Sequence, residues 1–227
     1  LVSKAPTTGS ASYAPDATAR PSTSAGSSFN AWAAQPNYNW TPLAAGSGLG
    51  FISSALSKNT TVVGPASLNL SLKSTATNTD IQVTISEVRP NGDEMYITSG
   101  FLRASYRTLA KSSTIYAPVP VYTLAATKLL TPGATTTIRV PINPIAYTFR
   151  AGSKIRISIS APGGDRPSWQ FGTLVTNGAV TNTVMFGKGS SLVLPTVSNV
   201  TATDTQPACH SNRGQPCRTY SAASNGG

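Results

Sequence analysis

The sequence predicts an all-β chain that folds as a sandwich of two sheets. Several segments alternate strictly between apolar and polar residues, which is the periodicity of a half-buried strand. Only 11% of the 227 residues are charged, and Ser, Thr, Gly and Pro are abundant, whereas helices favour Ala, Leu, Glu and Lys. Turn signals such as TPGA and APGGDRP separate the alternating segments. About eight short strands with no convincing helix are typical of a sandwich.

The clearest strand is SLNLSLKS, residues 67–74. Its leucines stand at alternate positions and should face the core, while the Ser, Asn and Lys residues between them face outward. Residues 79–102 are expected to form a hairpin, because TDIQVTISEV and MYITSGFL flank the turn sequence RPNGDE.

Further strands are expected over residues 135–142 and 154–160. In the second of these, KIRISIS, the isoleucines should point inward and the polar residues between them, including Arg156, outward. Residues 181–197 are expected to form a last hairpin that turns at Gly187–Gly189.

Composition divides the chain into three parts. Residues 1–40 are rich in Ser, Ala, Thr and Pro and indicate an extended lead-in. Residues 41–200 hold the alternating segments and should form the sandwich. Residues 201–227 are expected to be a polar tail.

Aromatic residues gather at the end of the lead-in, in FNAWAAQPNYNW. Trp32, Tyr38 and Trp40 could stack on sugar rings, so a free-standing carbohydrate-binding module is our alternative function. We favour another interpretation, in which these aromatic side chains pin a loop onto the sandwich.

The two cysteines, Cys209 and Cys217, stand close together in CHSNRGQPC. The Gly and Pro between them favour a turn, so we predict a disulfide, which forms in oxidising compartments and indicates a secreted protein. A zinc ion would need more ligands than two thiols and His210, the chain's one histidine. We therefore expect no metal and no cofactor.

We predict no catalytic residue in this chain. In PLAAGSGLGFIS, residues 42–53, Gly48 occupies the place where a nucleophile elbow needs serine, and we expect loop there. A catalytic triad needs a histidine, and His210 lies inside the predicted disulfide loop. Asp93 and Glu94 should be solvated at a hairpin turn, which leaves no facing carboxylate pair for glycoside hydrolysis.

The formal net charge is +10, from 17 basic and 7 acidic residues. The basic residues are spread along the chain and form no basic run or recognition helix, so we expect no nucleic-acid partner. No run of about 18 apolar residues exists that could cross a membrane as a helix.

Two long segments, residues 60–109 and 139–169, resemble the C-terminal jelly-roll domain of the CocE/NonD hydrolases. That group includes cocaine esterases, α-amino acid ester hydrolases and X-Pro dipeptidyl-peptidases. The matching motifs are GPASLNL, TDIQVTISEVRPNG, SGFLRASYR and FRAGSKIRISI. The ending CHSNRGQPCRTY resembles the tail of secreted members. The resemblance implies a galactose-binding-like jelly roll.

In that family the Ser-Asp-His triad belongs to an α/β-hydrolase domain that precedes the sandwich. The resemblance therefore implies that this chain is a non-catalytic C-terminal domain of a secreted serine hydrolase, either an acyl esterase or an X-Pro dipeptidyl-peptidase. Its partner is then an α/β-hydrolase domain, and the chain, inactive alone, is expected to be a fragment or processed piece. Assembly into a homo-oligomer stays an open alternative.

The loop APGGDRPSWQF is where we expect contact with the hydrolase domain. Asp165 and Arg166 could make polar contacts across the junction and Trp169 could anchor it, or the two charged residues could pair in a solvated turn. Arg103 and Arg107 are further interface candidates, with the alternative that their stems cover apolar surface.

Overall fold

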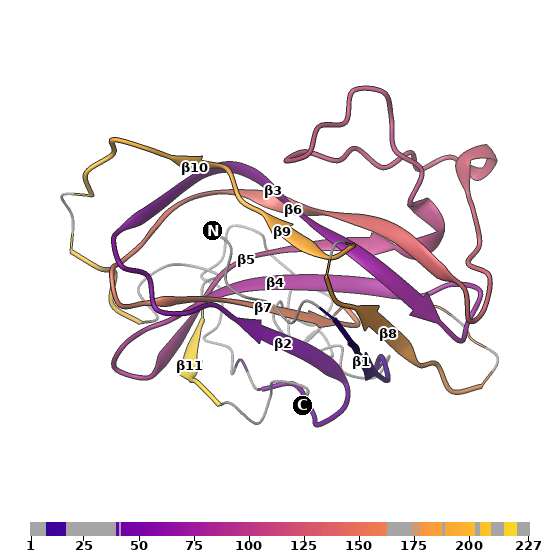
Figure 1. Cartoon of the computed structure of the whole chain (residues 1–227), viewed down its shortest axis with the longest axis horizontal. Helices are drawn as coiled ribbons and strands as arrows, with labels where there is room; N and C mark the ends of the chain where they lie inside the picture. Colours follow the sequence, from indigo (N-terminus) through magenta and orange to yellow (C-terminus); the bar gives the residue numbers. More distant parts are fainter. Residues whose placement is uncertain are drawn as a thin grey trace, which may run out of the picture.

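The computed structural model describes residues 8–16, 40, 42–162, 174, 176, 178–187, 189–202, 205–209 and 216–221. Within these residues the chain forms the predicted two antiparallel sheets, and its helical elements are two 3₁₀ turns, Ala104–Tyr106 and Leu124–Ala126 (Figure 1). No helix in this part of the chain has the length and apolar character needed to span a bilayer.

The first sheet is built around the long strand β3, Thr60–Ser74. Its other members are β1 (Ser10–Tyr13), β6 (Thr135–Phe149), β8 (Asn182–Met185), β9 (Ser191–Val193) and β10 (Thr196–Val197). Strand β6 pairs with β3 over almost its whole length, interrupted by a register shift between Gly64 and Ala66. Strands β8, β9 and β10 also pair with β3, and β1 extends the sheet beyond β8.

The second sheet has the strand order β11-β5-β4-β7-β2. Its members are β2 (Gly48–Ile52), β4 (Asp80–Val88), β5 (Asp93–Arg103), β7 (Lys154–Ser160) and β11 (Cys217–Thr219). Strands β4 and β5 form the predicted hairpin, and every neighbouring pair in this sheet is antiparallel.

The hairpin predicted for residues 181–197 is not formed. Strands β8, β9 and β10 each pair with β3, so the segment is one interrupted strand that runs antiparallel to β3. Gly187 has a φ of 88°, and a Cβ on Gly189 would lie 2.7 Å from the Cβ of Ser71. The two glycines therefore accommodate an irregularity against β3, where the sequence suggested a chain reversal.

The segment PLAAGSGLGFIS is a loop only in its first half, because Gly48–Ile52 forms the edge strand β2, which pairs with β7. Ser47 precedes this strand and its hydroxyl donates a 2.8 Å hydrogen bond to the carbonyl oxygen of Ala44. A nucleophile elbow has its serine between a strand and a helix, so the observed order differs from that motif.

Both ends of the chain contribute strands to the sandwich. Strand β1 lies within the expected lead-in, and β11 lies within the expected tail, so the sheets extend beyond residues 41–200. Each short strand carries a buried side chain, Tyr13 in β1 and Cys217 in β11. Burial of these side chains compensates for the small number of backbone hydrogen bonds in such short strands.

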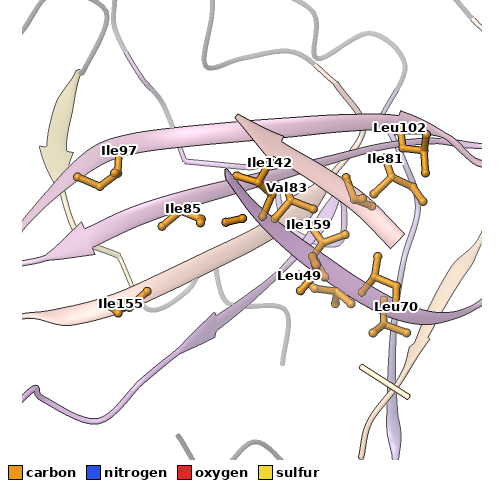
Figure 2. Close-up of a cluster of buried hydrophobic side chains, with 14 of the residues drawn as sticks. Leu49, Leu70, Ile81, Val83, Ile85, Ile97, Leu102, Ile142, Ile155 and Ile159 are labelled. Atoms are coloured by element: carbon orange, nitrogen blue, oxygen red, sulfur yellow. The ribbon is translucent and has the colours of Figure 1, made fainter. Parts of the chain in front are cut away.

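The core fills the space between the two sheets (Figure 2). Its fully buried members come from both sheets and include Leu49, Leu68, Leu70, Leu72, Ile81, Val83, Ile85, Ile138, Ile142 and Ile159. The leucines of β3 and the isoleucines of β4 are the residues that the alternating pattern predicts to face inward. Full burial of one such side chain stabilises the fold by about 1.5–3 kcal/mol.

The backbones of the two sheets come very close at Gly100 in β5. A Cβ at this position would lie 2.6 Å from the Cα of Ile142 in β6 and would clash with the carbonyl oxygen of Pro141. Only glycine fits at this crossing, because a backbone atom cannot move aside as the end of a flexible side chain can.

Residues 104–134 connect β5 to β6 and stand above the sandwich at the upper right of Figure 1. We call this segment the arm. Its described backbone is continuous, with the two 3₁₀ turns and an isolated bridge between Leu109 and Pro120.

Candidate functional site

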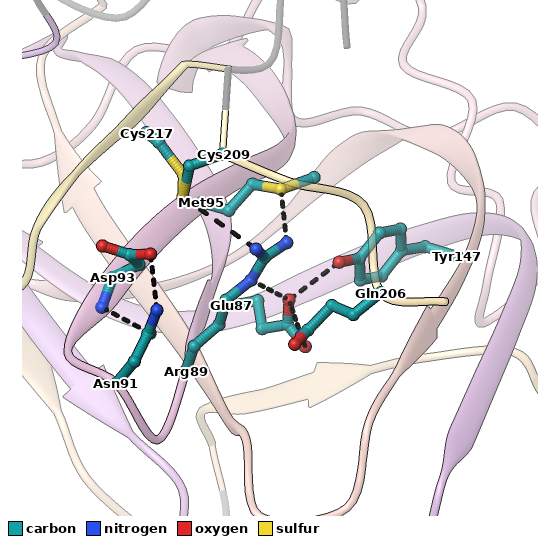
Figure 3. The surroundings of a disulfide bond; sticks show 9 residues. All are labelled: Glu87, Arg89, Asn91, Asp93, Met95, Tyr147, Gln206, Cys209 and Cys217. Carbon is teal, nitrogen blue, oxygen red and sulfur yellow. Dashed lines mark hydrogen bonds and ion pairs between the residues drawn. A yellow bond between two sulfur atoms is a disulfide. The ribbon is translucent and has the colours of Figure 1, made fainter. Parts of the chain in front are cut away.

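A buried carboxylate, Glu87, lies at the end of β4 beside the predicted disulfide (Figure 3). The hydroxyl of Tyr147 donates to its Oε2 at 2.7 Å, and Nε of Arg89 donates to the same oxygen at 3.1 Å. Nε2 of Gln206 lies 3.1 Å from both carboxylate oxygens. Each oxygen therefore has donors, and the charge is paired with an arginine.

Burial and the adjacent Glu87 keep Tyr147 protonated. Burial is the main cause that raises the pKa of Tyr147 well above its usual range, and the negative charge of Glu87 raises it further. The phenol therefore stays neutral at physiological pH and keeps donating to the carboxylate. Tyr147, Arg89 and Gln206 therefore hold the carboxylate of Glu87 inside the fold through hydrogen bonds from its own chain.

Arg89 extends from Glu87 to the sulfur atoms. Its Nη2 lies 2.9 Å from Sδ of Met95, and its Nη1 lies 3.9 Å from Sγ of Cys209. Cys209 and Cys217 form the predicted disulfide, with their Cα atoms 5.4 Å apart. The bond joins the segment that carries Gln206 to β11, so it holds a donor of Glu87 against the sheet.

A second buried carboxylate, Glu94, lies on the outer face of the second sheet and accepts hydrogen bonds from three strands around it. We expected it to be solvated, but it is fully buried. Nη1 of Arg156 donates to its Oε1 at 2.9 Å and the hydroxyl of Ser86 to the same oxygen at 2.6 Å. Nε of Arg218 donates to Oε2 at 2.8 Å.

Arg156 faces outward from the sheet, as the alternation predicts, yet it is fully buried. Burial lowers the pKa of its guanidinium, and the charge of Glu94 opposes that shift. An arginine remains charged in this setting, and two charges removed from water need each other's hydrogen bonds. Glu94 and Arg156 therefore link β5 to β7 across the outer surface of β4.

Trp40 is buried and packs on this second cluster. The guanidinium carbon of Arg218 lies 3.7 Å from the centre of its ring, and Tyr96 meets it edge-on with ring centres 6.0 Å apart. Its ring therefore packs against protein, as in the pinning interpretation, and does not form a sugar platform. Trp32 and Tyr38, the other candidates for sugar stacking, lie outside the described residues.

Arg103 and Arg107 both make bonds within the chain. Arg103 pairs with both carboxylate oxygens of Asp80, at 2.7 and 2.9 Å, and this hydrogen bonding raises the pKa of Arg103. Arg107 donates to backbone carbonyl oxygens of Ala104, Lys128 and Leu129. A role for either at an interface stays a prediction.

The other interface candidates, Asp165, Arg166 and Trp169, lie outside the described residues, as does His210. Within the described ranges, no group of three His, Cys, Asp or Glu side chains is placed to hold a metal ion.

Neither carboxylate cluster was predicted from the sequence. One signal was present: Glu87 and Arg89 stand two apart at the end of a strand, so their side chains share a face. No comparable signal joins Glu94 to Arg156 and Arg218, which are far apart in the sequence.

Comparison with known proteins identifies the domain type. Residues 4–194 match the family described as the X-Pro dipeptidyl-peptidase C-terminal non-catalytic domain. Two curated proteins, candidate serine esterases of Mycobacterium bovis and Mycobacterium tuberculosis, are each 32% identical to this chain over 115 residues. The match covers 49% of this chain and only 18% of each relative, so the chain spans less than a fifth of their length.

Solved structures share the fold at low sequence identity. A CocE/NonD family hydrolase from Staphylococcus aureus aligns with a TM-score of 0.55 and 20% identity, over 66% of this chain and 30% of its own. An aminopeptidase from a marine-sediment Thaumarchaeota archaeon aligns with a TM-score of 0.59 and 15% identity, over 87% of this chain and 34% of its own. An α-amino acid ester hydrolase aligns with a TM-score of 0.50 and 15% identity, over 67% of this chain and 26% of its own. None of these relatives is named as a carbohydrate-binding module, so that alternative gains no support.

Proposed function

Since the chain belongs to the family of X-Pro dipeptidyl-peptidase C-terminal non-catalytic domains, we propose that it serves a secreted serine hydrolase by packing on an α/β-hydrolase domain and helping to shape the active site there. The family match over residues 4–194 is the observation that carries this proposal. The names of the relatives, which are esterases, hydrolases and an aminopeptidase, support an ester or amide substrate.

The chemistry of the described side chains agrees with a supporting role. Glu87 and Glu94 are both buried and both bonded to arginine, so neither is available to move a proton at a substrate. A rigid sandwich can still supply one wall of a neighbouring cleft, because loops at the ends of a sheet are free to vary in sequence.

The reaction itself is then performed by the partner domain. Its serine would attack the carbonyl carbon of an acyl ester, or of the peptide bond after an N-terminal X-Pro dipeptide, and form an acyl-enzyme as the alcohol or the amine leaves. Water would then hydrolyse the acyl-enzyme, which releases the acid and regenerates the serine. The disulfide between Cys209 and Cys217 supports secretion, because such bonds persist in oxidising compartments.

The test compares this chain with the product of the complete reading frame. We expect the complete protein to hydrolyse p-nitrophenyl acetate or Ala-Pro-p-nitroanilide, and the 227-residue chain to hydrolyse neither. Turnover by the 227-residue chain that disappears when one of its own serines is replaced would contradict the proposal. A reading frame that encodes no hydrolase domain, with no such domain bound to the purified protein, would contradict it as well.

A further inference from the structure

We propose that the hydrolase domain docks on the arm, residues 104–134, and on the groove beneath it. The complementary surface of the hydrolase domain is then an apolar patch with acidic residues at its rim. This inference rests on the proposed function for the identity of the partner. It places the contact on a part of the chain other than the loop after β7 that the sequence suggested.

The arm exposes an unusual amount of apolar surface. Its large apolar side chains are exposed at Leu124 (91%), Tyr122 (63%), Leu129 (60%), Ile115 (53%), Tyr116 (43%) and Val119 (43%). Single exposed apolar residues are ordinary, but a group of them on one segment marks an interaction surface in a soluble protein.

Hydrogen bonds hold the arm in a defined shape. Within it, the amides of Ala110 and Val121 donate to carbonyl oxygens across its two limbs. The arm is also attached to the sandwich, because the hydroxyl of Ser67 in β3 donates to the carbonyl oxygen of Ile115 at 2.6 Å. Tyr106 packs edge-on against Tyr122 with ring centres 5.4 Å apart. The exposed side chains are therefore presented by a structured backbone, which lowers the entropy lost on docking.

An apolar groove lies between the arm and the sandwich. It has a volume of about 390 Å³ and is lined by Pro65, Pro118, Pro141, Pro144, Phe101 and Tyr122 among others. Proline has no backbone N–H, so much of this lining offers no hydrogen-bond donor. The groove therefore suits apolar side chains from a partner.

The charge of the arm disfavours a symmetric contact between the arms of two copies of this chain. Residues 95–164 contain no Asp or Glu, whereas the arm carries Arg107, Lys111 and Lys128. Two arms brought together would place cations against cations, which opposes association. A surface with acidic residues around an apolar centre complements the arm in both respects.

The length of the relatives beyond the part that this chain matches favours the hydrolase domain as this partner. The arm lies inside the matched residues 4–194, and the mycobacterial relatives extend far beyond the 18% of their length that this chain covers. In such proteins the remainder of the polypeptide is always present beside the sandwich at high effective concentration.

The experiment measures thermal unfolding in two contexts, the 227-residue chain and the complete hydrolase that contains it. The variant Leu124→Ser/Leu129→Ser removes two exposed side chains and should leave the midpoint of the 227-residue chain unchanged. In the complete hydrolase it should lower the midpoint of the sandwich by about 4 °C or more, because the docking contacts are lost. Val200→Ser is the matched control, since Val200 is exposed outside the arm, and it should change neither protein.

A charge variant tests the acidic rim. Lys111→Glu/Lys128→Glu should also lower the midpoint only in the complete hydrolase, and more at low than at high ionic strength. Amides of the arm should exchange with deuterium more slowly in the complete hydrolase than in the 227-residue chain.

Three results would overturn the inference. These are an equal effect of the arm variant in both contexts, no effect in either, or a dimer of the 227-residue chain that Leu124→Ser dissociates in sedimentation. Failure of the proposed function is a separate outcome, because it appears as the absence of a hydrolase domain or of esterase and peptidase activity, whatever the arm variants do.

Discussion

Arg156 and Glu94 form an ion pair with a distance of 2.9 Å, and at most 1% of either side chain is exposed to solvent. The pair crosses the outer surface of β4 and joins β7 to β5, and Arg218 of β11 completes it from the other side. The second sheet therefore depends on a buried charge cluster on one face and on an apolar core on the other.

Removing the charge of Glu94 should strongly destabilise the chain. Glu94→Gln keeps the shape of the side chain but removes the carboxylate charge that Arg156 and Arg218 bind, and breaking a buried pair in this way costs about 3–5 kcal/mol. Urea unfolding measures the loss. Asp93→Asn is the control at the neighbouring position, where the carboxylate bonds the exposed Asn91, and should stay within about 0.5 kcal/mol. Equal losses in the two variants would show that Glu94 has no special role.

Loss of the disulfide should release the tail. Cys209→Ser/Cys217→Ser should lower the free energy of unfolding by about 2–3 kcal/mol through the entropy of the unfolded chain alone. Gln206 and Arg218, which the bond holds near their carboxylates, should add to that loss. Reducing agent should destabilise the parent chain and leave the double variant unchanged. Two reactive thiols in the denatured, unreduced parent would contradict the bond itself.

Gly100→Ala should destabilise the sandwich because its new methyl group would meet the backbone of β6. Overpacking of this kind costs about 1–3 kcal/mol and more where backbone must move. Gly133→Ala provides a contrast, since Gly133 has a φ of 76° but open space around it, so that substitution introduces backbone strain alone. The prediction is a larger loss at Gly100 than at Gly133 in thermal or urea unfolding. The reverse order would mean that the strands separate more easily than their spacing indicates.

The stability of the chain should fall at alkaline pH through its buried tyrosines. Burial raises the pKa of Tyr13 from 10.0 to about 12. Below pH 10 both the folded and the unfolded chain hold this proton, and the stabilisation is complete. Between about pH 10 and 12 the unfolded chain loses the proton first, so the free energy of unfolding decreases by about 1.4 kcal/mol per pH unit.

Tyr13→Phe should reduce the steepness of that alkaline decline. The variant also loses the hydrogen bond from Nδ2 of Asn182 to the phenol oxygen, so it is compared with the parent by slope and not by absolute stability. Urea unfolding at several values between pH 9 and 12 gives both slopes. Parallel curves for parent and variant would show that Tyr13 does not titrate with folding.

The sequence predicts the fold class and most of the core because those properties are local. The leucines of β3 and the isoleucines of β4 alternate within a few residues, and the Pro/Asn-Gly turn between β4 and β5 carries its own signal. The disulfide also follows from a short spacing, with a turn between the two thiols.

The burial of Arg156 could not be predicted in the same way. Alternation assigns a residue to one side of a sheet, but it does not tell whether that side is covered. The cover here includes Trp40 and Arg218, which come from opposite ends of the chain. The residues around Gly187 present the same difficulty, because a Gly-rich sequence permits either a reversal or a bulge, and the distant strand β3 determines which one forms.

Strand β3 has both of its neighbours downstream, with β6 on one side and the segment from β8 to β10 on the other. While the ribosome makes the protein, one edge of β3 therefore stays incompletely paired until residue 197 has been added. Synthesis of the residues between β3 and residue 197 takes on the order of ten seconds at about 5–20 residues per second. A nascent chain with such an open edge can pair with other nascent chains and is a natural client for chaperones. Shortening the protein before residue 197 should for this reason give insoluble material in place of a smaller folded product.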